Sequence, residues 1–250
     1  MRIAAIFNIW ADCLCLLPCA IENIRPVVDE IIVVWSRKSN RGNVAEYELP
    51  KGCTLIQCEP RYSTPHLNEI AKRNAGLQAV KDGGFTHFIM MDSDEFYIQS
   101  DFIEEKKRIE ALNISGTVCK TQAYFKSPTL TIGVDHTIVP FIHKVTPRLE
   151  YKLNFANYPY AYENGSARID CTRRLNITKG VEVSKITMHH FSYVRKDMSL
   201  KLANSSANFK PQRSQVVYED LQNAKPGYFC RGWQRELIQC ENIFNLPEYD

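Results

Sequence analysis

Apolar runs alternate with helically spaced segments along the first half of the chain. Strands are predicted at residues 2–9, 30–35, 54–58 and 85–91. Continuous apolar runs of this kind are typical of strands that are covered on both faces in a parallel sheet. Helices are predicted at residues 13–23, 65–81 and 101–112, where apolar side chains recur at helical spacing. The alternation predicts an α/β fold with a mostly parallel central sheet and right-handed crossovers.

The second half of the chain is less regular. Strands are predicted at residues 116–131, 137–145 and 185–194, and a helix around residues 198–202. There is no internal repeat and no low-complexity linker. We therefore expect one domain, in which the second half forms a mixed elaboration of the parallel sheet.

An acidic cluster follows the fourth predicted strand directly. Asp92 and Asp94 stand one residue apart, after four apolar residues. Ligands of parallel sheets bind beyond the carboxyl ends of the strands, which is where this pair would lie. Mg²⁺ and Mn²⁺ prefer oxygen ligands and leave positions open for phosphates. Such a pair also occurs in solvated surface turns, but the apolar strand before it favours a site for a metal ion that offsets charge on a leaving diphosphate.

Composition and charge narrow the possible partners. The 250 residues are 44% hydrophobic and 24% charged, as in ordinary globular proteins, and the net charge of +3 does not by itself indicate nucleic acid. Between residues 171 and 215, however, nine basic residues oppose only Glu182 and Asp197. This stretch is either a solvated face or a site for phosphate-bearing ligands.

Cysteine usage and hydropathy bear on the compartment. The nine cysteines show no CxxC pair, and the chain opens without the pattern of a signal peptide. The apolar runs are shorter than the roughly 20 residues that span a bilayer. We therefore expect free thiols and a cytoplasmic protein.

Three stretches resemble the nucleotide-sugar glycosyltransferases of the GT-A fold, particularly the large inverting group that contains family two. Residues 28–34 (VDEIIVV) resemble the second strand of that group, residues 71–76 (AKRNAG) its "ARNxG" helix, and residues 88–95 (FIMMDSDE) its acidic strand end. Trp35 and Ser36 depart from the family, which usually has acidic residues there that touch the base. The identity of the base therefore stays open.

The second half resembles little-characterised members of this group, some of them encoded by phages. The matching pieces are residues 170–174 (DCTRR), 188–195 (MHHFSYVR) and 201–206 (KLANSS). The resemblance implies a Rossmann-like GT-A fold, with the nucleotide-sugar half at residues 1–115 and the acceptor half with its C-terminal extension at residues 116–250. It also implies metal-dependent, inverting transfer from a UDP-sugar to a saccharide or a lipid-linked saccharide.

The same resemblance suggests residues for each role. For Mn²⁺ or Mg²⁺ the ligands would be Asp92, Asp94 and His190. His190 is preferred over His189 because neighbouring side chains of a strand face opposite ways. The candidates for donor binding are Arg73, Asp92, Asp94, Arg173, Arg174 and Arg195. The candidates for the general base are Asp170, Asp135 and Glu163.

Other functions remain open at this point. A hydroxymethylated base of phage DNA is an alternative acceptor, which the basic stretch would suit. A nucleotidyltransferase that makes sugar nucleotides is disfavoured, because residues 8–13 contain no glycine of a phosphate loop. A non-catalytic binding module would have no need of Asp92 and Asp94.

Overall fold

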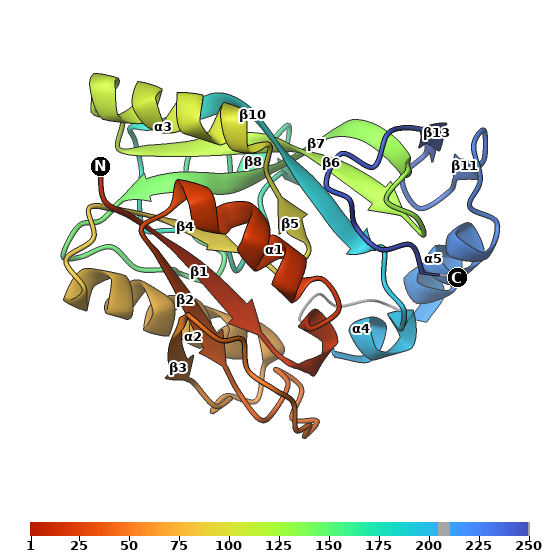
Figure 1. Ribbon diagram of the computed structural model, residues 1–250, viewed down its shortest axis with the longest axis horizontal. Coiled ribbons are helices and arrows are strands. Elements are labelled where there is room, and N and C mark those ends of the chain that lie inside the picture. Colours follow the sequence, from red (N-terminus) through yellow and green to blue (C-terminus); the bar gives the residue numbers. More distant parts are fainter. Residues whose placement is uncertain (205–210, 250) are drawn as a thin grey trace.

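The structure is a computed structural model that describes residues 1–204 and 211–249, and it describes the side chains of all these residues except 211–214. The molecule is built around one nine-stranded sheet (Figure 1). The strand order is β3-β2-β1-β4-β7-β6-β10-β5, and β13 pairs with β7. The parallel strands are β1 (Ile3–Ile9), β2 (Glu30–Trp35), β3 (Thr54–Gln57) and β4 (His87–Met91). The mixed part contains β5 (Glu95–Phe96), β6 (Gly116–Phe125), β7 (Leu130–Lys144), β10 (Val181–Tyr193) and β13 (Ile238–Gln239). The predicted α/β class, with a parallel first half and a mixed second half, is confirmed.

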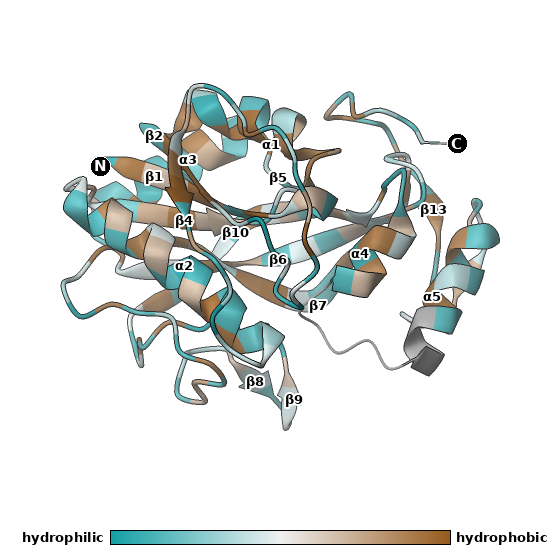
Figure 2. Cartoon of the chain, turned by 90° about the horizontal axis from the view of Figure 1, so that it is seen from below, coloured by the Kyte–Doolittle hydropathy of each residue, from teal (hydrophilic) through white to brown (hydrophobic). Residues whose placement is uncertain are grey.

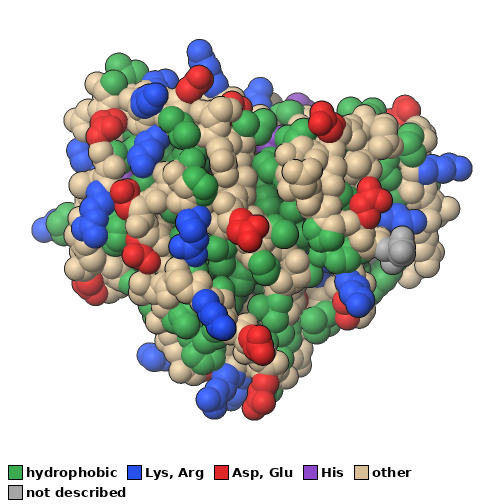
Figure 3. Space-filling view, in the orientation of Figure 1, with side chains coloured by type: hydrophobic (Ala, Val, Ile, Leu, Met, Phe, Trp, Pro, Cys, Tyr) green, Lys and Arg blue, Asp and Glu red, His purple; other side chains and the backbone are tan. Residues whose placement is uncertain are grey.

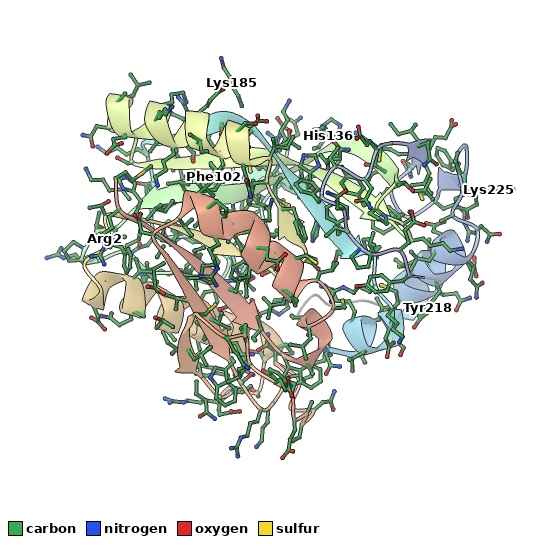
Figure 4. The ribbon with its side chains drawn as sticks, in the orientation of Figure 1. Arg2, Phe102, His136, Lys185, Tyr218 and Lys225 are labelled. Carbon is green, nitrogen blue, oxygen red and sulfur yellow. The ribbon has the colours of Figure 1, made fainter. Side chains whose placement is uncertain are left out.

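Helices cover both faces of the parallel strands. The helices of the described residues are α1 (Leu17–Ile24), α2 (Pro65–Asp82), α3 (Gln99–Leu112), α4 (Met198–Asn204) and α5 (Pro211–Gln222). Of these, α5 packs on the mixed strands β6 and β7. In Figure 2, α1 and α3 lie on one side of the sheet and α2 on the other. Phe7 of β1 packs with α1 and α3, and Ile6 packs with α2, because neighbouring side chains of a strand face opposite ways. Phe102 of α3 is accordingly buried against the sheet (Figure 4).

Close packing of α2 on β1 depends on a glycine. A Cβ atom at Gly76 would lie 2.4 Å from Cγ2 of Ile6 and 3.0 Å from Cγ2 of Val34. The glycine therefore lets the helix approach the sheet closely, and this fixes the position of the residues that precede it on α2.

Two predicted boundaries are wrong. The strand predicted over residues 116–131 is a hairpin, since β6 ends at Phe125 and β7 begins at Leu130. Lys126 has a φ of 63°, and Pro128 cannot donate to a strand ladder, so the chain turns there. The helix predicted from residue 13 begins only at Leu17, with a proline in its first turn and a short 3₁₀ helix before it.

Smaller elements of the second half have no sequence prediction. They are the hairpins β8 (Tyr162–Glu163) with β9 (Ser166–Ala167) and β11 (Phe229–Cys230) with β12 (Arg235–Glu236), and the helix α5. The sheet is continuous between the halves 1–115 and 116–250, because β7 of the second half pairs directly with β4 of the first. Within the described ranges, no helix is both long enough and apolar enough to cross a membrane.

A buried histidine makes folding sensitive to mild acid. His143 is 1% exposed and shares a 2.8 Å hydrogen bond with the Tyr158 hydroxyl, and burial lowers its pKa from 6.5 to about 3. Between pH 6 and pH 5 the unfolded chain protonates this histidine while the folded chain does not, so stability falls as pH falls. His143→Gln should therefore reduce the loss of unfolding free energy between these pH values by about 1 kcal/mol. Urea titrations of both proteins at pH 6 and pH 5 measure this, and equal losses would contradict it.

Candidate active site

A pocket of about 420 Å³ opens beyond the carboxyl ends of β1 and β4. These two strands are parallel neighbours, so the residues that follow them meet at one edge of the sheet. Trp10 after β1 and Asp92 after β4 both line the pocket, which also covers parts of β7, β6 and β10. This is the place that the sequence predicts for a ligand, and the volume suits a small molecule.

Asp92 lies beside two arginines. Its Oδ2 accepts a 2.6 Å hydrogen bond from Arg173, and its Oδ1 lies 3.5 Å from Nη2 of Arg73. Arg73, on α2, also pairs with Glu69 at 2.9 Å. Burial disfavours the charged carboxylate, but the two guanidinium groups outweigh burial and lower the pKa of Asp92. Asp92 is therefore an anion held between cations.

Arg173 joins Asp92 to a second carboxylate. The same guanidinium donates to Glu95, whose side chain is 1% exposed, and Glu95 accepts a 3.1 Å hydrogen bond from the backbone N–H of Asp92. Burial raises the pKa of Glu95 even though Arg173 acts in the opposite direction. The turn after β4 is thus tied to the loop that carries Arg173.

Asp94 is held by two further cations. Its Oδ2 accepts hydrogen bonds from Arg195 and, at 3.2 Å, from the amine of Lys201. Burial disfavours the charge on Asp94, but Lys201 and Arg195 outweigh it and place its pKa well below the usual range. Its other oxygen, Oδ1, has no hydrogen-bond partner and lies 3.6 Å from Nε2 of His190. Arg195 follows β10 directly, and Lys201 lies on α4.

The predicted metal ligands are only partly brought together. His190 lies beside Asp94, whereas His189 faces the other way and shares a 2.7 Å hydrogen bond with the Tyr124 hydroxyl, as strand alternation predicts. Asp92 is engaged by arginines instead. Across residues 1–204 and 211–249, no three His, Cys, Asp or Glu side chains form a group that could hold an ion. This geometry does not fit the expected three-ligand site, and metal dependence stays a prediction of the sequence.

Several polar atoms along the pocket have no hydrogen-bond partner among the described residues. They include both amide atoms of Asn8, Nε and Nη1 of Arg73, Oγ of Ser93 and Oδ1 of Asp94. A buried polar group without a partner costs free energy, about 1–3 kcal/mol for each. A ligand that offered many donors and acceptors would satisfy these groups. The pocket is therefore suited to a polar molecule.

Strands β6 and β7 line another part of the pocket. Asp135, on β7, accepts hydrogen bonds through Oδ1 from the Thr121 hydroxyl at 2.8 Å and from the Thr137 N–H at 2.6 Å. Its Oδ2 has no partner among the residues described. β6 separates β7 from β10, on which His190 pairs with Ala123 of β6. Two strand spacings of about 4.8 Å put β7 and β10 roughly 10 Å apart.

The other two candidate bases differ in position. Asp170 lines the pocket, and its Oδ1 accepts hydrogen bonds from the N–H and the hydroxyl of Thr172 at 2.7 and 2.5 Å. Glu163 is exposed on β8, pairs with Arg168 at 3.2 Å and is not among the lining residues. Trp233 also lines the pocket and packs edge-to-face on Phe125.

The predicted donor-binding residues do not all reach the pocket. Arg73, Arg173 and Arg195 line it, but Arg174 does not. Arg174 is 1% exposed, donates to the carbonyl of Ile169 and lies over the ring of Tyr162. Its role is therefore structural in this geometry.

Sequence reasoning did not assign Lys72, Lys201, Asn8 or Glu95 to the site. Lys72 stands one residue before Arg73 in the family-like helix motif, which is a signal that could have pointed to it. Lys201 lies within the predicted basic stretch. Asn8 and Glu95 have no such signal beyond their places, Asn8 near the end of β1 and Glu95 shortly after β4.

Part of the basic stretch is used inside the protein. Arg173, Arg174 and Arg195 are buried, while Lys185 projects into solvent (Figure 4). Lys210, the side chain of Arg213 and residues 205–206 of the family-like segment lie outside the described part. On the face in Figure 3, basic and acidic side chains are interspersed.

Comparisons with known proteins give distant structural likeness only. No family model matches the sequence, and neither does any curated protein. TarS of S. aureus is similar at 13% identity and a TM-score of 0.44, over 89% of this chain and 43% of that one. TarS 1-349 in complex with UDP is similar at 13% identity and a TM-score of 0.44, over 89% of this chain and 71% of that one. TarS 1-349 in complex with UDP-GlcNAc is similar at 12% identity and a TM-score of 0.43, over 89% of this chain and 72% of that one. The chain thus spans less than half of the longer TarS chain, and likeness at this level assigns no activity.

Proposed function

We propose that the chain transfers a sugar from a nucleotide-sugar donor, a UDP-sugar in the first instance, to a hydroxyl group of a saccharide or lipid-linked saccharide. The observation that carries this is the pocket beyond β1 and β4, where basic side chains and partnerless polar atoms gather. A nucleoside diphosphate offers negative charge together with many donors and acceptors. It would satisfy both features at once.

The residues that line the pocket suggest where the donor and the acceptor would lie. The diphosphate would lie near Arg173 and Arg195, and the sugar would extend across β10 and β6 toward Asp135. The distance of roughly 10 Å between β10 and β7 leaves room for a sugar ring. The acceptor oxygen attacks C1, the bond from C1 to the phosphate oxygen breaks, and the proton of the acceptor hydroxyl passes to Oδ2 of Asp135. Attack from the side opposite the leaving group inverts the configuration at C1.

The acceptor end favours a neutral acceptor over DNA. Asp135 and Asp170 both line the pocket, and carboxylates repel phosphates. Trp233 offers an aromatic surface there, of the kind that small polar ligands pack against in pockets. The buried arginines of the basic stretch are not available to a duplex. A saccharide therefore suits the pocket better than hydroxymethylated DNA does.

The donor is tested by thermal unfolding with a panel of UDP-, GDP-, TDP- and CMP-sugars. One donor class should stabilise the protein, because a ligand at 100 times its Kd adds about 2.7 kcal/mol to the unfolding free energy. Product analysis with saccharide and DNA acceptors follows for that donor. If none of these nucleotides shifts the unfolding temperature, the proposed function is wrong.

A further inference from the structure

The two carboxylates expected to bind a metal ion are bound to basic side chains instead. Resting on the proposed function, we infer that protein cations hold the donor diphosphate and stabilise its charge as it leaves, with no divalent cation required. The basic side chains that line this end of the pocket are Lys72, Arg73, Arg173, Arg195 and Lys201.

The surroundings of Asp94 and Asp92 leave little place for a divalent cation. Arg195 and Lys201 share one oxygen of Asp94, and Arg173 and Arg73 flank Asp92. An ion between these carboxylates would sit among four like charges, and the repulsion at about 4 Å is about 4 kcal/mol for each pair of unit charges near a protein surface. The guanidinium and ammonium groups already contact the carboxylate oxygens, apart from Oδ1 of Asp94, which has no hydrogen-bond partner among the described residues.

Other nitrogen atoms of the cluster are free to bind a phosphate. Lys72 is 3% exposed and lines the pocket; no hydrogen bond or ion pair joins its amine to a described residue, and its charge helps to lower the pKa of Glu59. Nε and Nη1 of Arg73 are buried and have no hydrogen-bond partner among the described residues, although Nη2 of the same guanidinium pairs with Glu69. Buried donors without partners cost free energy, so these adjacent residues of α2 are suited to a ligand with anionic oxygens.

The chemistry of the step is complete without a metal. When the bond between C1 and the diphosphate breaks, its electron pair stays on the phosphate oxygen. Fixed cations that face this oxygen stabilise the developing charge directly, and no proton has to be transferred to the leaving group. The carboxylates hold the long basic side chains in place before the donor arrives, and this preorganisation is what makes such stabilisation effective.

Calorimetric titration of the full chain with UDP, and in parallel with GDP, tests the inference. The protein is dialysed against EDTA, and each titration is repeated with Mn²⁺. We expect the Kd of the bound nucleotide to agree within about threefold between the two buffers. Lys72→Met should weaken binding by about 10- to 100-fold in both, which is the loss of one charge-assisted contact. The matched control is Lys107→Met on α3, an exposed lysine outside the pocket, with unchanged binding.

The other possible outcomes contradict either this inference or the proposed function. Binding that is lost in EDTA and restored by Mn²⁺ overturns this inference and leaves the proposed function standing. Wild-type affinity in a folded Lys72→Met protein also overturns it. Failure of every nucleotide in both buffers overturns the proposed function itself. Circular dichroism of each variant shows that it is folded.

Discussion

Asp135→Asn is expected to lower the rate of sugar transfer by about 100- to 10,000-fold, which is the usual contribution of a general base. The amide keeps the size of the carboxylate and can still accept the hydrogen bonds of Thr121 and Thr137, so the fold should not change. Donor binding should be unchanged as well, because Asp135 has no ion pair with the described basic side chains that line the pocket and bonds to Thr121 and Thr137 instead. Initial rates with the donor found by thermal unfolding, alongside calorimetric nucleotide binding, measure the two effects separately.

Two matched variants control this prediction. Glu163→Gln alters an exposed carboxylate outside the pocket and should leave the rate unchanged. Asp170→Asn alters the other carboxylate that borders the acceptor end, and we expect a smaller loss than at Asp135. A full rate in Asp135→Asn together with a large loss in Asp170→Asn would assign the base to Asp170 instead.

Arg173→Met should destabilise the fold by about 3–5 kcal/mol at pH 8, the cost of breaking a buried ion pair. The change leaves Glu95, which is 1% exposed, without the guanidinium that neutralises it. Because burial already raises the pKa of Glu95, its protonation can relieve part of the cost, so the destabilisation should shrink as pH falls toward 5. Urea titrations at pH 8 and pH 5 measure both effects.

A double variant and a surface control sharpen this test. Adding Glu95→Gln to Arg173→Met removes the buried carboxylate charge that has lost its partner. The double variant should therefore recover part of the stability lost in Arg173→Met. Lys152→Met breaks a pair with Glu150 in which both side chains are about half exposed, and it should cost at most about 1 kcal/mol. If Arg173→Met and Lys152→Met have equal effects, the Arg173 cluster contributes no more than a surface pair.

The sequence predicted the parallel half of the sheet because the information is local there. After Glu30, the residues of β2 are apolar throughout, and a strand covered on both faces requires this. The helix over α2 follows from its apolar spacing and from the proline and glycines at its ends. Asp92 could be placed at the edge of the sheet because a ligand site of such a sheet lies where the strands end.

The second half was harder to predict because its elements are short and depend on tertiary contacts. Residues 116–131 have strand propensity throughout, and only Pro128 and the turn before it separate β6 from β7. The hairpin β11–β12 has two residues in each strand. Elements of this size have no periodicity that a sequence could reveal.

The sequence by itself determined which residues stand at the ends of strands and which of two neighbouring histidines faces the acidic cluster. Only the tertiary structure decided what those carboxylates bind. Arg173 lies 81 positions from Asp92, and Arg195 and Lys201 lie 101 and 107 positions from Asp94. Arg173 and Arg174 are adjacent and chemically alike, yet Arg173 lines the pocket and Arg174 is buried away from it. Periodicity follows from the chain alone, whereas ion pairing depends on which distant segments the fold brings within contact.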